Sequence, residues 1–300
     1  MLGTVLRLLP AIIGMTVGFL LRRSGVAQHR DGDFLFRLVF YVTLPPLMFT
    51  SLSTVEITRH LAVFPAAALI AMTAGYLTGR TVATRLRMPP AQAAIMLCAC
   101  MIVNTGFALP FVQALYGADG VARVAAFDAV NIALTFTWAY YAAARGNPEH
   151  EGGSVLVAAL LRSPPLYGIA AGLAVNLAGV EVPAAVRAPL DTFGAVTAVL
   201  ISLGVGILFE PPGRDVGRAA WTVGIRLATG LAVGLGIVAA FDLGGMDRTI
   251  LLLLAVAPVG FISVTFASLE NLDVRLAVNA LSLSTVSGFV LSLAITLISA

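Results

Sequence analysis

Long hydrophobic runs separated by short polar gaps cover almost the whole chain. Most runs are about 20 residues long, which is the length that a helix needs to cross the hydrocarbon core of a bilayer. We predict ten such helices, near residues 2–21, 34–52, 61–80, 91–115, 121–142, 164–179, 188–209, 220–241, 248–268 and 275–299. The pattern therefore predicts an all-α integral membrane protein with ten transmembrane helices.

The longest polar gap, residues 145–153, lies between the fifth and sixth runs. The segment that follows, residues 154–162, is hydrophobic but too short to span, and we predict that it is an interfacial helix. The gap divides the chain into three parts. Residues 1–142 form the first five-helix unit, residues 143–163 a cytoplasmic linker, and residues 164–300 the second five-helix unit.

The fourth run contains a stretch, residues 101–110, through which an apolar helix should not pass cleanly. Gly106 lowers helix stability, and Pro110 removes an amide donor and clashes with the carbonyl four residues earlier. Asn104 and Thr105 place polar side chains among apolar ones. Irregular backbone at membrane depth is tolerated only where it is buried in protein or lines a cavity. We therefore predict a broken helix and a binding site at this point.

One constant offset superimposes the two halves of the chain and preserves the order of the runs. It matches glycine, proline and aspartate positions without a gap: Pro10 with Pro164, Gly14 with Gly168, Gly106 with Gly260 and Asp119 with Asp273. Each half holds an odd number of runs, so the two halves would have opposite orientations in the membrane. The pattern predicts two inverted five-helix repeats.

The same offset carries Asn104 to Pro258, inside the ninth run. Two hydrophobic segments that are interrupted at corresponding positions point to the binding site of a transporter. We predict that broken helices 4 and 9 cross near the midplane, where half-helix N-termini direct partial positive charge at one point, as an anion requires. The candidate substrate-binding residues are Asn104, Thr105, Gly106, Pro110, Pro258, Val259, Gly260 and Thr43.

Structural explanations stay open for several of these residues. Asn104 and Thr105 would also satisfy the free amides of the broken helix itself. Pro110 and Pro258 act first as helix breakers. Thr43 precedes two prolines, so a kink in the second helix is the alternative to a contact with substrate.

Asp128 is the most informative ionisable residue, because it lies inside the fifth run. Asp128, Asn131 and Thr135 share one face of a helix. Carboxylates at membrane depth are rare and usually mark ion or substrate paths, so Asp128 is a candidate for taking up a proton or helping to hold a cation. Capping of a nearby half-helix is the alternative. The candidates for coupling or support are Asp128, Asn131 and Arg226.

Composition agrees with a membrane protein, since 59% of the residues are hydrophobic and 11% are charged. A soluble domain carries about 25% charged residues. All 18 basic residues are arginine, and most lie in the loops that follow the odd-numbered runs. By the positive-inside rule these loops are cytoplasmic and both termini face outward. We expect a multi-pass protein of the cell membrane, the inner membrane of a bacterium, without nucleic-acid binding.

The usual signatures of enzymes are missing from the sequence. It holds no H-E-x-x-H, no G-x-S-x-G and no P-loop. The three histidines, His29, His60 and His150, lie in separate loops and indicate no metal centre. We expect no catalysis, no cofactor and no metal. The G-x-x-x-G pairs that begin at Gly14 and Gly168 indicate close helix packing.

Three stretches resemble bacterial members of the auxin efflux carrier family: residues 34–51, residues 104–117 with their Asn-Thr-Gly-Phe core, and residues 281–285. The resemblance covers essentially the whole chain. It implies ten spans in two inverted repeats, crossed helices 4 and 9, and transport of organic anions, malate and malonate among them. The chain departs from the family at residues 196–200 and 226–230, where relatives often carry a proline.

We interpret the sequence as that of a secondary transporter that moves small organic anions, such as carboxylates, by alternating access. A sodium-coupled symporter of the bile-acid type is the alternative within transport. A non-transporting membrane receptor or an intramembrane enzyme is the alternative from another class. The expected partners are the organic anion and membrane lipids, and a second copy of the chain in a homodimer is a further candidate.

Overall fold

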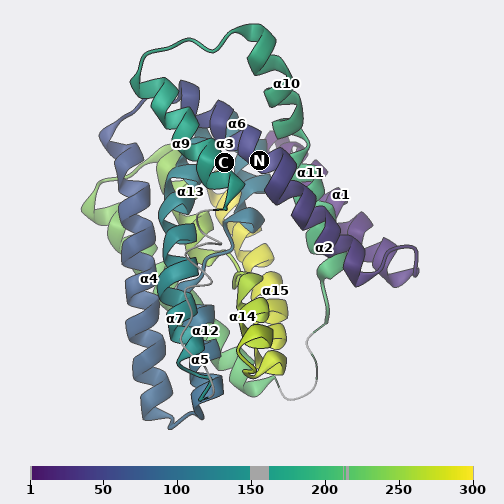
Figure 1. Ribbon diagram of the computed structural model, residues 1–300, viewed down its shortest axis with the longest axis vertical. Coiled ribbons are helices and arrows are strands. Elements are labelled where there is room, and N and C mark those ends of the chain that lie inside the picture. The colour runs from purple at the N-terminus through teal and green to yellow at the C-terminus, as the bar shows by residue number, and fades with distance from the viewer. Residues whose placement is uncertain (1, 149–161, 212, 214–215, 300) are drawn as a thin grey trace.

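A computed structural model describes residues 2–148, 162–211, 213 and 216–299, and the described part is helical (Figure 1). Its elements are α1 (Leu2–Arg23), α2 (His29–Leu38), η1 (Val39–Thr43), α3 (Leu44–Thr54), α4 (Arg59–Arg85), α5 (Pro90–Met101), α6 (Thr105–Leu134), η2 (Thr135–Ala139), α7 (Tyr140–Ala144), α9 (Pro164–Leu177), α10 (Ala184–Ala195), α11 (Thr197–Leu208), α12 (Gly217–Ala240), α13 (Gly245–Val256), α14 (Ile262–Leu269) and α15 (Val274–Ile298), where η marks a π-helix. Within the described residues no strand forms. The interfacial helix predicted at 154–162 lies almost entirely outside them.

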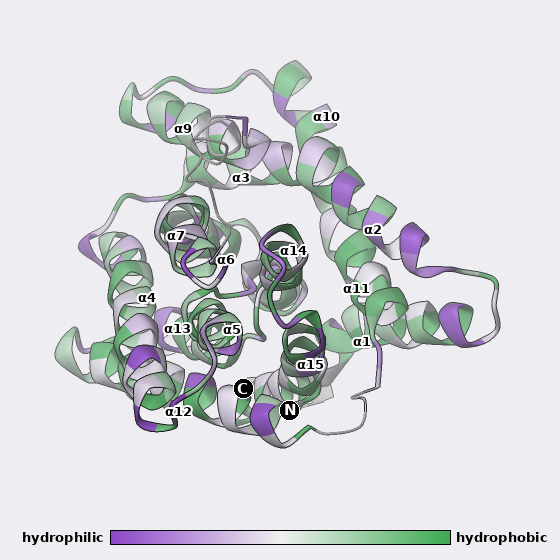
Figure 2. Cartoon of the chain, turned by 60° about the horizontal axis from the view of Figure 1, so that its bottom comes forward, coloured by the Kyte–Doolittle hydropathy of each residue, from purple (hydrophilic) through white to green (hydrophobic). Residues whose placement is uncertain are grey.

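In the part of the chain that the structure describes, six helical stretches are long and apolar enough to cross a membrane. They are His29–Thr54, Arg59–Arg85, Thr105–Ala144, Ala184–Leu208, Gly217–Ala240 and Val274–Ile298. Hydrophobic residues cover much of the outer helix surface, whereas hydrophilic residues gather near helix ends and in loops (Figure 2). These features are consistent with an integral membrane protein. The count of ten spans, the inverted repeat and the three-part division of the chain stay predictions.

Local sequence signals explain where several helices begin. The side chains of Thr58, Asn104 and Asp273 each accept a hydrogen bond from a backbone amide in the first turn of the following helix. Such caps satisfy amides that have no partner inside the helix. Pro90 and Pro164 stand at the first position of α5 and α9, where the missing amide costs nothing.

The helices form two groups, which we call the first and second bundles. The first bundle consists of α1, α2, η1, α3, α9, α10 and α11, with α1 packed along α11 and α3 along α9. The second consists of α4, α5, α6, η2, α7 and α12 to α15, with α4 against α5, α6 and α12. Helix α6 also contacts α1, α3 and α11 of the first bundle. Figure 2 shows the first bundle as an arc along one side of the second.

Glycines set the close approach inside the first bundle. A methyl carbon built on Gly18 would lie 2.2 Å from the Leu203 carbonyl oxygen, and one on Gly206 would lie 2.1 Å from that of Met15. Between α9 and α3, a methyl carbon on Gly168 would lie 2.4 Å from a backbone oxygen. The predicted close packing of the G-x-x-x-G pairs is therefore confirmed.

The first helix break lies within the predicted stretch 101–110, at its beginning. Helix α5 ends at Met101 and α6 begins at Thr105, so Gly106 and Pro110 lie inside α6. The physical reason is the cap at Asn104, whose side chain accepts a hydrogen bond from the Phe107 amide and restarts the helix before the proline. The expectation that Gly106 and Pro110 break the helix is wrong.

Two other interruptions match the sequence. Gly117 has φ 56° and ψ −141° inside α6, between the fourth and fifth predicted spans. In the second predicted span, the π-helical stretch η1 ends at Thr43, immediately before α3 with its two prolines. These positions are changes of helix direction or register rather than ends of the hydrophobic segment.

The packing of α1 on α11 generates a stability prediction. Gly206→Ala should lower the thermal unfolding temperature of the purified protein in detergent, because overpacking costs about 1–3 kcal/mol. Gly236→Ala on α12 is the matched control, since nothing lies within 4 Å of a methyl carbon built there. Alanine is the better helix former, so the control should be neutral or slightly stabilising. Equal unfolding temperatures for Gly206→Ala and the wild type would contradict the packing described here.

Candidate functional site

Two interruptions of helical backbone meet inside the second bundle. They are Ile102–Asn104, between α5 and α6, and Ala257–Phe261, between α13 and α14, and we call them the paired breaks. Val103 and Val259 form an isolated antiparallel bridge. The Asn104 amide donates to the Pro258 carbonyl at 3.1 Å, and the Gly260 amide donates to the Ile102 carbonyl at 3.4 Å. Each break therefore satisfies part of the other's backbone.

Three buried side chains satisfy further backbone groups of the paired breaks. Asn131 of α6 donates to the Val103 carbonyl at 3.2 Å and accepts from the Val103 amide at 3.4 Å. Ser284 of α15 accepts from the Val259 amide at 3.0 Å. Arg226 of α12 donates to the carbonyls of residues 257 and 258, at 2.7 and 3.4 Å.

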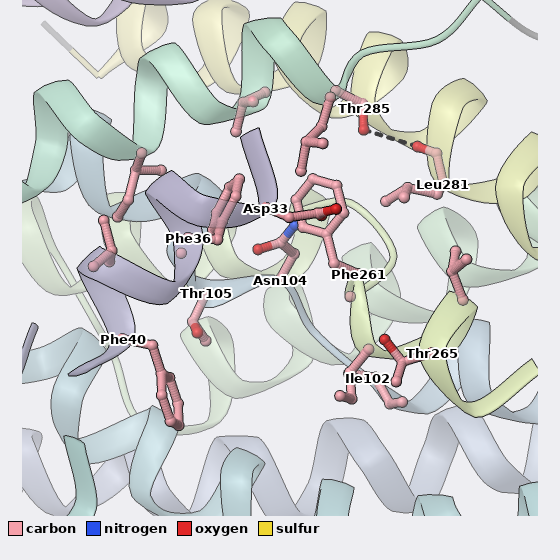
Figure 3. A pocket seen from close by; sticks show the side chains of 18 of the residues that line it. Asp33, Phe36, Phe40, Ile102, Asn104, Thr105, Phe261, Thr265, Leu281 and Thr285 are labelled. Carbon is pink, nitrogen blue, oxygen red and sulfur yellow. Dashed lines mark hydrogen bonds between the residues drawn. The ribbon is translucent and has the colours of Figure 1, made fainter. Parts of the chain in front are cut away.

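A cavity of about 900 Å³ lies between the two bundles, beside the paired breaks. Figure 3 shows polar side chains of the breaks, together with side chains from α2, η1, α14 and α15, around the same space. The second bundle lines it with Ile102, Asn104, Thr105, Gly106, Asp128, Asn131, Gly260, Phe261, Thr265, Ser282 and Thr285 among others. The first bundle lines it with residues that include His29, Asp33, Phe36, Arg37, Phe40, Ile201, Val205 and Glu210.

The charged residues of the lining divide into a rim and an interior. His29 and Asp33 in the first half of α2, both exposed, and the half-buried Glu210 after α11 lie near the loops after α1 and α11. Arg37, also exposed, lies in the last turn of α2. Asp128 is 5% exposed and lies beside the paired breaks. The cavity therefore has a charged rim at the end of the molecule that carries the loops after α1 and α11, and one carboxylate deep inside.

An aromatic contact joins the two bundles across the cavity. The ring centroids of Phe36 on α2 and Phe261 beside α14 lie 5.0 Å apart (Figure 3). Such tilted ring pairs contribute about 0.5–1.5 kcal/mol beyond their buried area. The lining thus combines aromatic surface with amide, hydroxyl and carboxylate groups.

Asp128 belongs to a hydrogen-bond network at the cavity wall. Its Oδ1 atom accepts from the Thr105 hydroxyl at 2.8 Å and from the Asn131 side-chain amide at 2.9 Å. Asn131 also holds Val103, so the network connects the carboxylate directly to the paired breaks.

The structure brings six of the candidate residues together at the cavity: Asn104, Thr105, Gly106, Gly260, Asp128 and Asn131. Pro110 and Val259 are buried away from the lining, and Pro258 contributes its carbonyl to the pairing of the breaks. Thr43 is buried, and its hydroxyl has no partner among the described residues. Arg226 lies behind the breaks beside a separate small cavity.

Sequence reasoning did not single out the contribution of α2. Asp33, Phe36, Arg37 and Phe40 all line the cavity and follow one another at helical spacing. The signal for this contribution in the sequence was that two charged and two aromatic residues share one face of a hydrophobic segment. It is weak, because the chain has 16 phenylalanines and nine of the ten predicted spans contain at least one.

The sequence is similar to those of known membrane proteins. A sequence profile described as "Membrane transport protein" matches residues 4–297. Similar proteins include an uncharacterized transporter of Methanothermobacter thermautotrophicus, 26% identical over 300 residues with 96% of each chain covered. Another is an uncharacterized transporter of Methanocaldococcus jannaschii, 19% identical over 290 residues with 92% of each chain covered.

These matches and the apolar helices define a multi-pass membrane protein of the transporter class. The chain belongs to the membrane transport protein family, which is the auxin efflux carrier family, and the resemblance in its sequence is confirmed.

The role of Asn131 generates a second stability prediction. Asn131→Ala removes both hydrogen bonds to Val103, and a buried unpaired backbone group costs about 1–3 kcal/mol. The unfolding temperature in detergent should therefore fall by several degrees. Thr137→Ala on the same helical stretch is the control, because Thr137 is exposed and bonds only to its own helix. Equal stability of the two variants would show that Asn131 does not support the paired breaks.

Proposed function

We propose that this protein is a secondary transporter that carries small organic anions, carboxylates in particular, across the cytoplasmic membrane by alternating access. The observation that carries the proposal is the cavity of about 900 Å³ beside the paired breaks, between two separately packed bundles. Binding sites for small molecules have volumes of about 300–1,000 Å³ and combine apolar walls with a few polar groups. The lining of this cavity fits that description.

Two helix starts at the cavity wall support an anionic substrate. Helix α6 begins at Thr105 and α14 at Ile262, and both residues line the cavity. The first amides of a helix have no partner inside it, and the N-terminus carries a partial positive charge. A carboxylate between the two helix starts would receive hydrogen bonds and a favourable field from both.

Asn104 supports the same substrate class. Its Oδ1 atom is used by the Phe107 amide, whereas its Nδ2 group donates to no described residue. Asn104 is 9% exposed and lines the cavity, so this donor is available to a bound carboxylate. Arg37, which also lines the cavity, adds a cationic group.

The division into bundles supports alternating access. Both paired breaks belong to the second bundle, so a displacement of this bundle would move the binding groups together. The cavity has its rim at the loops after α1 and α11, which the arginine pattern predicts to be cytoplasmic. We therefore interpret this conformation as open to the cytoplasm, with helices 4 and 9 crossing at the substrate site as in an inverted-repeat carrier.

Asn104→Ser tests the substrate site in proteoliposomes. Serine keeps the helix cap but loses the amide donor, and a hydrogen bond to a charged group contributes about 1.5–3 kcal/mol. Carboxylate uptake should fall by at least about tenfold with little change in unfolding temperature. Thr81→Ala on the exposed face of α4 should transport like the wild type. A wild-type rate of uptake for Asn104→Ser would show that the Asn104 side-chain amide does not bind the substrate.

A thermal-shift panel tests the substrate class. Acetate, lactate, malonate, succinate, L-malate and citrate are compared with malonamide and succinamide, which have the same skeletons without charge. At least one carboxylate should raise the unfolding temperature, because a ligand that binds only the folded state stabilises it. Stabilisation by the amides alone would overturn the anion assignment. Sodium-dependent stabilisation would favour the symporter of the bile-acid type, and binding without solute flux would favour a receptor.

A further inference from the structure

Asp128 combines burial with an unused oxygen atom. Both of its hydrogen bonds, from Thr105 and Asn131, reach Oδ1. In the described part of the chain, Oδ2 receives no hydrogen bond and no arginine or histidine nitrogen lies within 4.0 Å. The residue is 5% exposed and lines the large cavity. Its second oxygen is therefore open to whatever enters the cavity.

The charged and titratable groups around Asp128 do not compensate its charge. In the same cavity they are His29, Asp33 and Arg37 of α2, Tyr41 of η1 and Glu210 after α11. Helices α14 and α15 contribute the neutral Thr265, Ser282 and Thr285.

Among the described residues, the other elements packed around α6 add no counter-ion either. Arg226 of α12 and Cys100 of α5 lie beside the separate cavity behind the breaks, where Arg226 bonds to carbonyl oxygens. At the far part of α6, Arg123 pairs with Asp247 of α13, which also meets His60 of α4. Arg7 of α1 donates to the carbonyl of Leu115.

A buried carboxylate without a cationic partner is unfavourable at membrane depth, so it must take up a proton or bind a cation. The neighbours offer few oxygen ligands to a metal cation, which leaves the proton. Thr105 and the Asn131 amide group act as donors to Asp128, and the Asn131 carbonyl oxygen is used by the Val103 amide. A hard metal cation needs several free oxygen ligands. The described residues contain no cluster of three or more carboxylate, histidine or cysteine ligands.

The substrate adds a second reason for a proton on Asp128, and this reason rests on the proposed function. An organic anion beside the starts of α6 and α14 shares the cavity with Asp128. Two carboxylates repel each other when both are ionised, whereas a protonated carboxyl donates a hydrogen bond to a carboxylate. Anion binding and proton binding at Asp128 must therefore favour each other, and by reciprocity each strengthens the other.

We propose that Asp128 is the proton-binding site of this carrier and that one proton crosses the membrane on Asp128 together with each organic anion. The proton binds Oδ2 on the side where the anion enters and leaves to water on the side where the anion is released. Asp128 thus makes the carrier a proton–anion symporter, and no covalent bond other than O–H forms or breaks.

Reconstituted protein tests this proposal with the carboxylate that gives the largest thermal shift in the panel above. Uptake is measured in sodium-free proteoliposomes, with and without a pH gradient that is acidic on the source side, while an internal pH dye reports proton entry. For the wild type, the gradient should accelerate uptake at least about tenfold, and addition of the carboxylate should drive proton entry. Carboxylate flux without proton entry, or flux that requires sodium, overturns the proton site and leaves the proposed function standing.

Asp128→Asn is the decisive variant, because its amide imitates the neutral carboxyl but does not ionise and so cannot carry a proton across. Exchange of labelled carboxylate without a gradient should persist, whereas acceleration by the gradient and proton entry should disappear. Asp119→Asn, an exposed carboxylate on the same helix, is the matched control and should couple like the wild type. Proton entry that survives in Asp128→Asn overturns the proposal.

A binding measurement keeps the test valid if Asp128→Asn does not fold. Titration calorimetry of the wild type over a series of pH values, in buffers with different ionisation enthalpies, reports the protons taken up with the ligand. Uptake should rise towards one proton for each carboxylate bound as the pH is raised, because the ligand-free protein then loses the proton that the bound anion retains. Binding without proton uptake at every pH overturns the proton site alone, and no binding or flux of any carboxylate overturns the proposed function as well.

Discussion

The backbone of the two helix breaks is the constraint on which the rest of the structure depends. A peptide group without a partner costs several kcal/mol in hydrocarbon, so an interrupted helix in a membrane needs partners from elsewhere in the protein. Here Val103 and Val259 pair the two breaks, and Asn131, Ser284 and Arg226 reach them from three other helices. The arrangement of the second bundle follows from these contacts.

Two charges buried in the second bundle have different relations to this backbone. Arg226 donates to the carbonyls of Ala257 and Pro258, which follow the last turn of α13, where the helix carries a partial negative charge. These carbonyls therefore compensate part of the positive charge, while Arg226 Nε has no hydrogen-bond partner among the described residues. Asp128 meets donors on one oxygen and the cavity on the other. Arg226 supports the paired breaks, whereas Asp128 keeps one oxygen atom for a proton or a ligand that enters the cavity.

The sequence predicts those features that depend on local chemistry. Asn104, Thr105 and Pro258 stand out in apolar segments, and the structure places all three at or beside the meeting point of the breaks. The first break lies inside the predicted stretch 101–110, but Gly106 and Pro110 do not cause it, because the cap formed by Asn104 restarts the helix before them. The aromatic lining was not predictable, since nothing local distinguishes Phe36 and Phe261 from phenylalanines that face lipid or core. Their place depends on how two distant segments pack.

The connection from α3 to α4 has a mechanical consequence. The two bundles are joined by the chain at residues 55–58, 145–163 and 209–216, and the first of these tethers is the shortest. Asn176 of α9 donates to the carbonyls of Leu52 and Val55, both at 2.8 Å, and so fixes the start of this tether to the first bundle. Only Glu56, Ile57 and Thr58 remain to absorb a displacement, and an extended residue spans about 3.3–3.6 Å. Any large movement between the bundles must therefore be a rotation about this corner, with the greatest travel at the opposite end of the molecule.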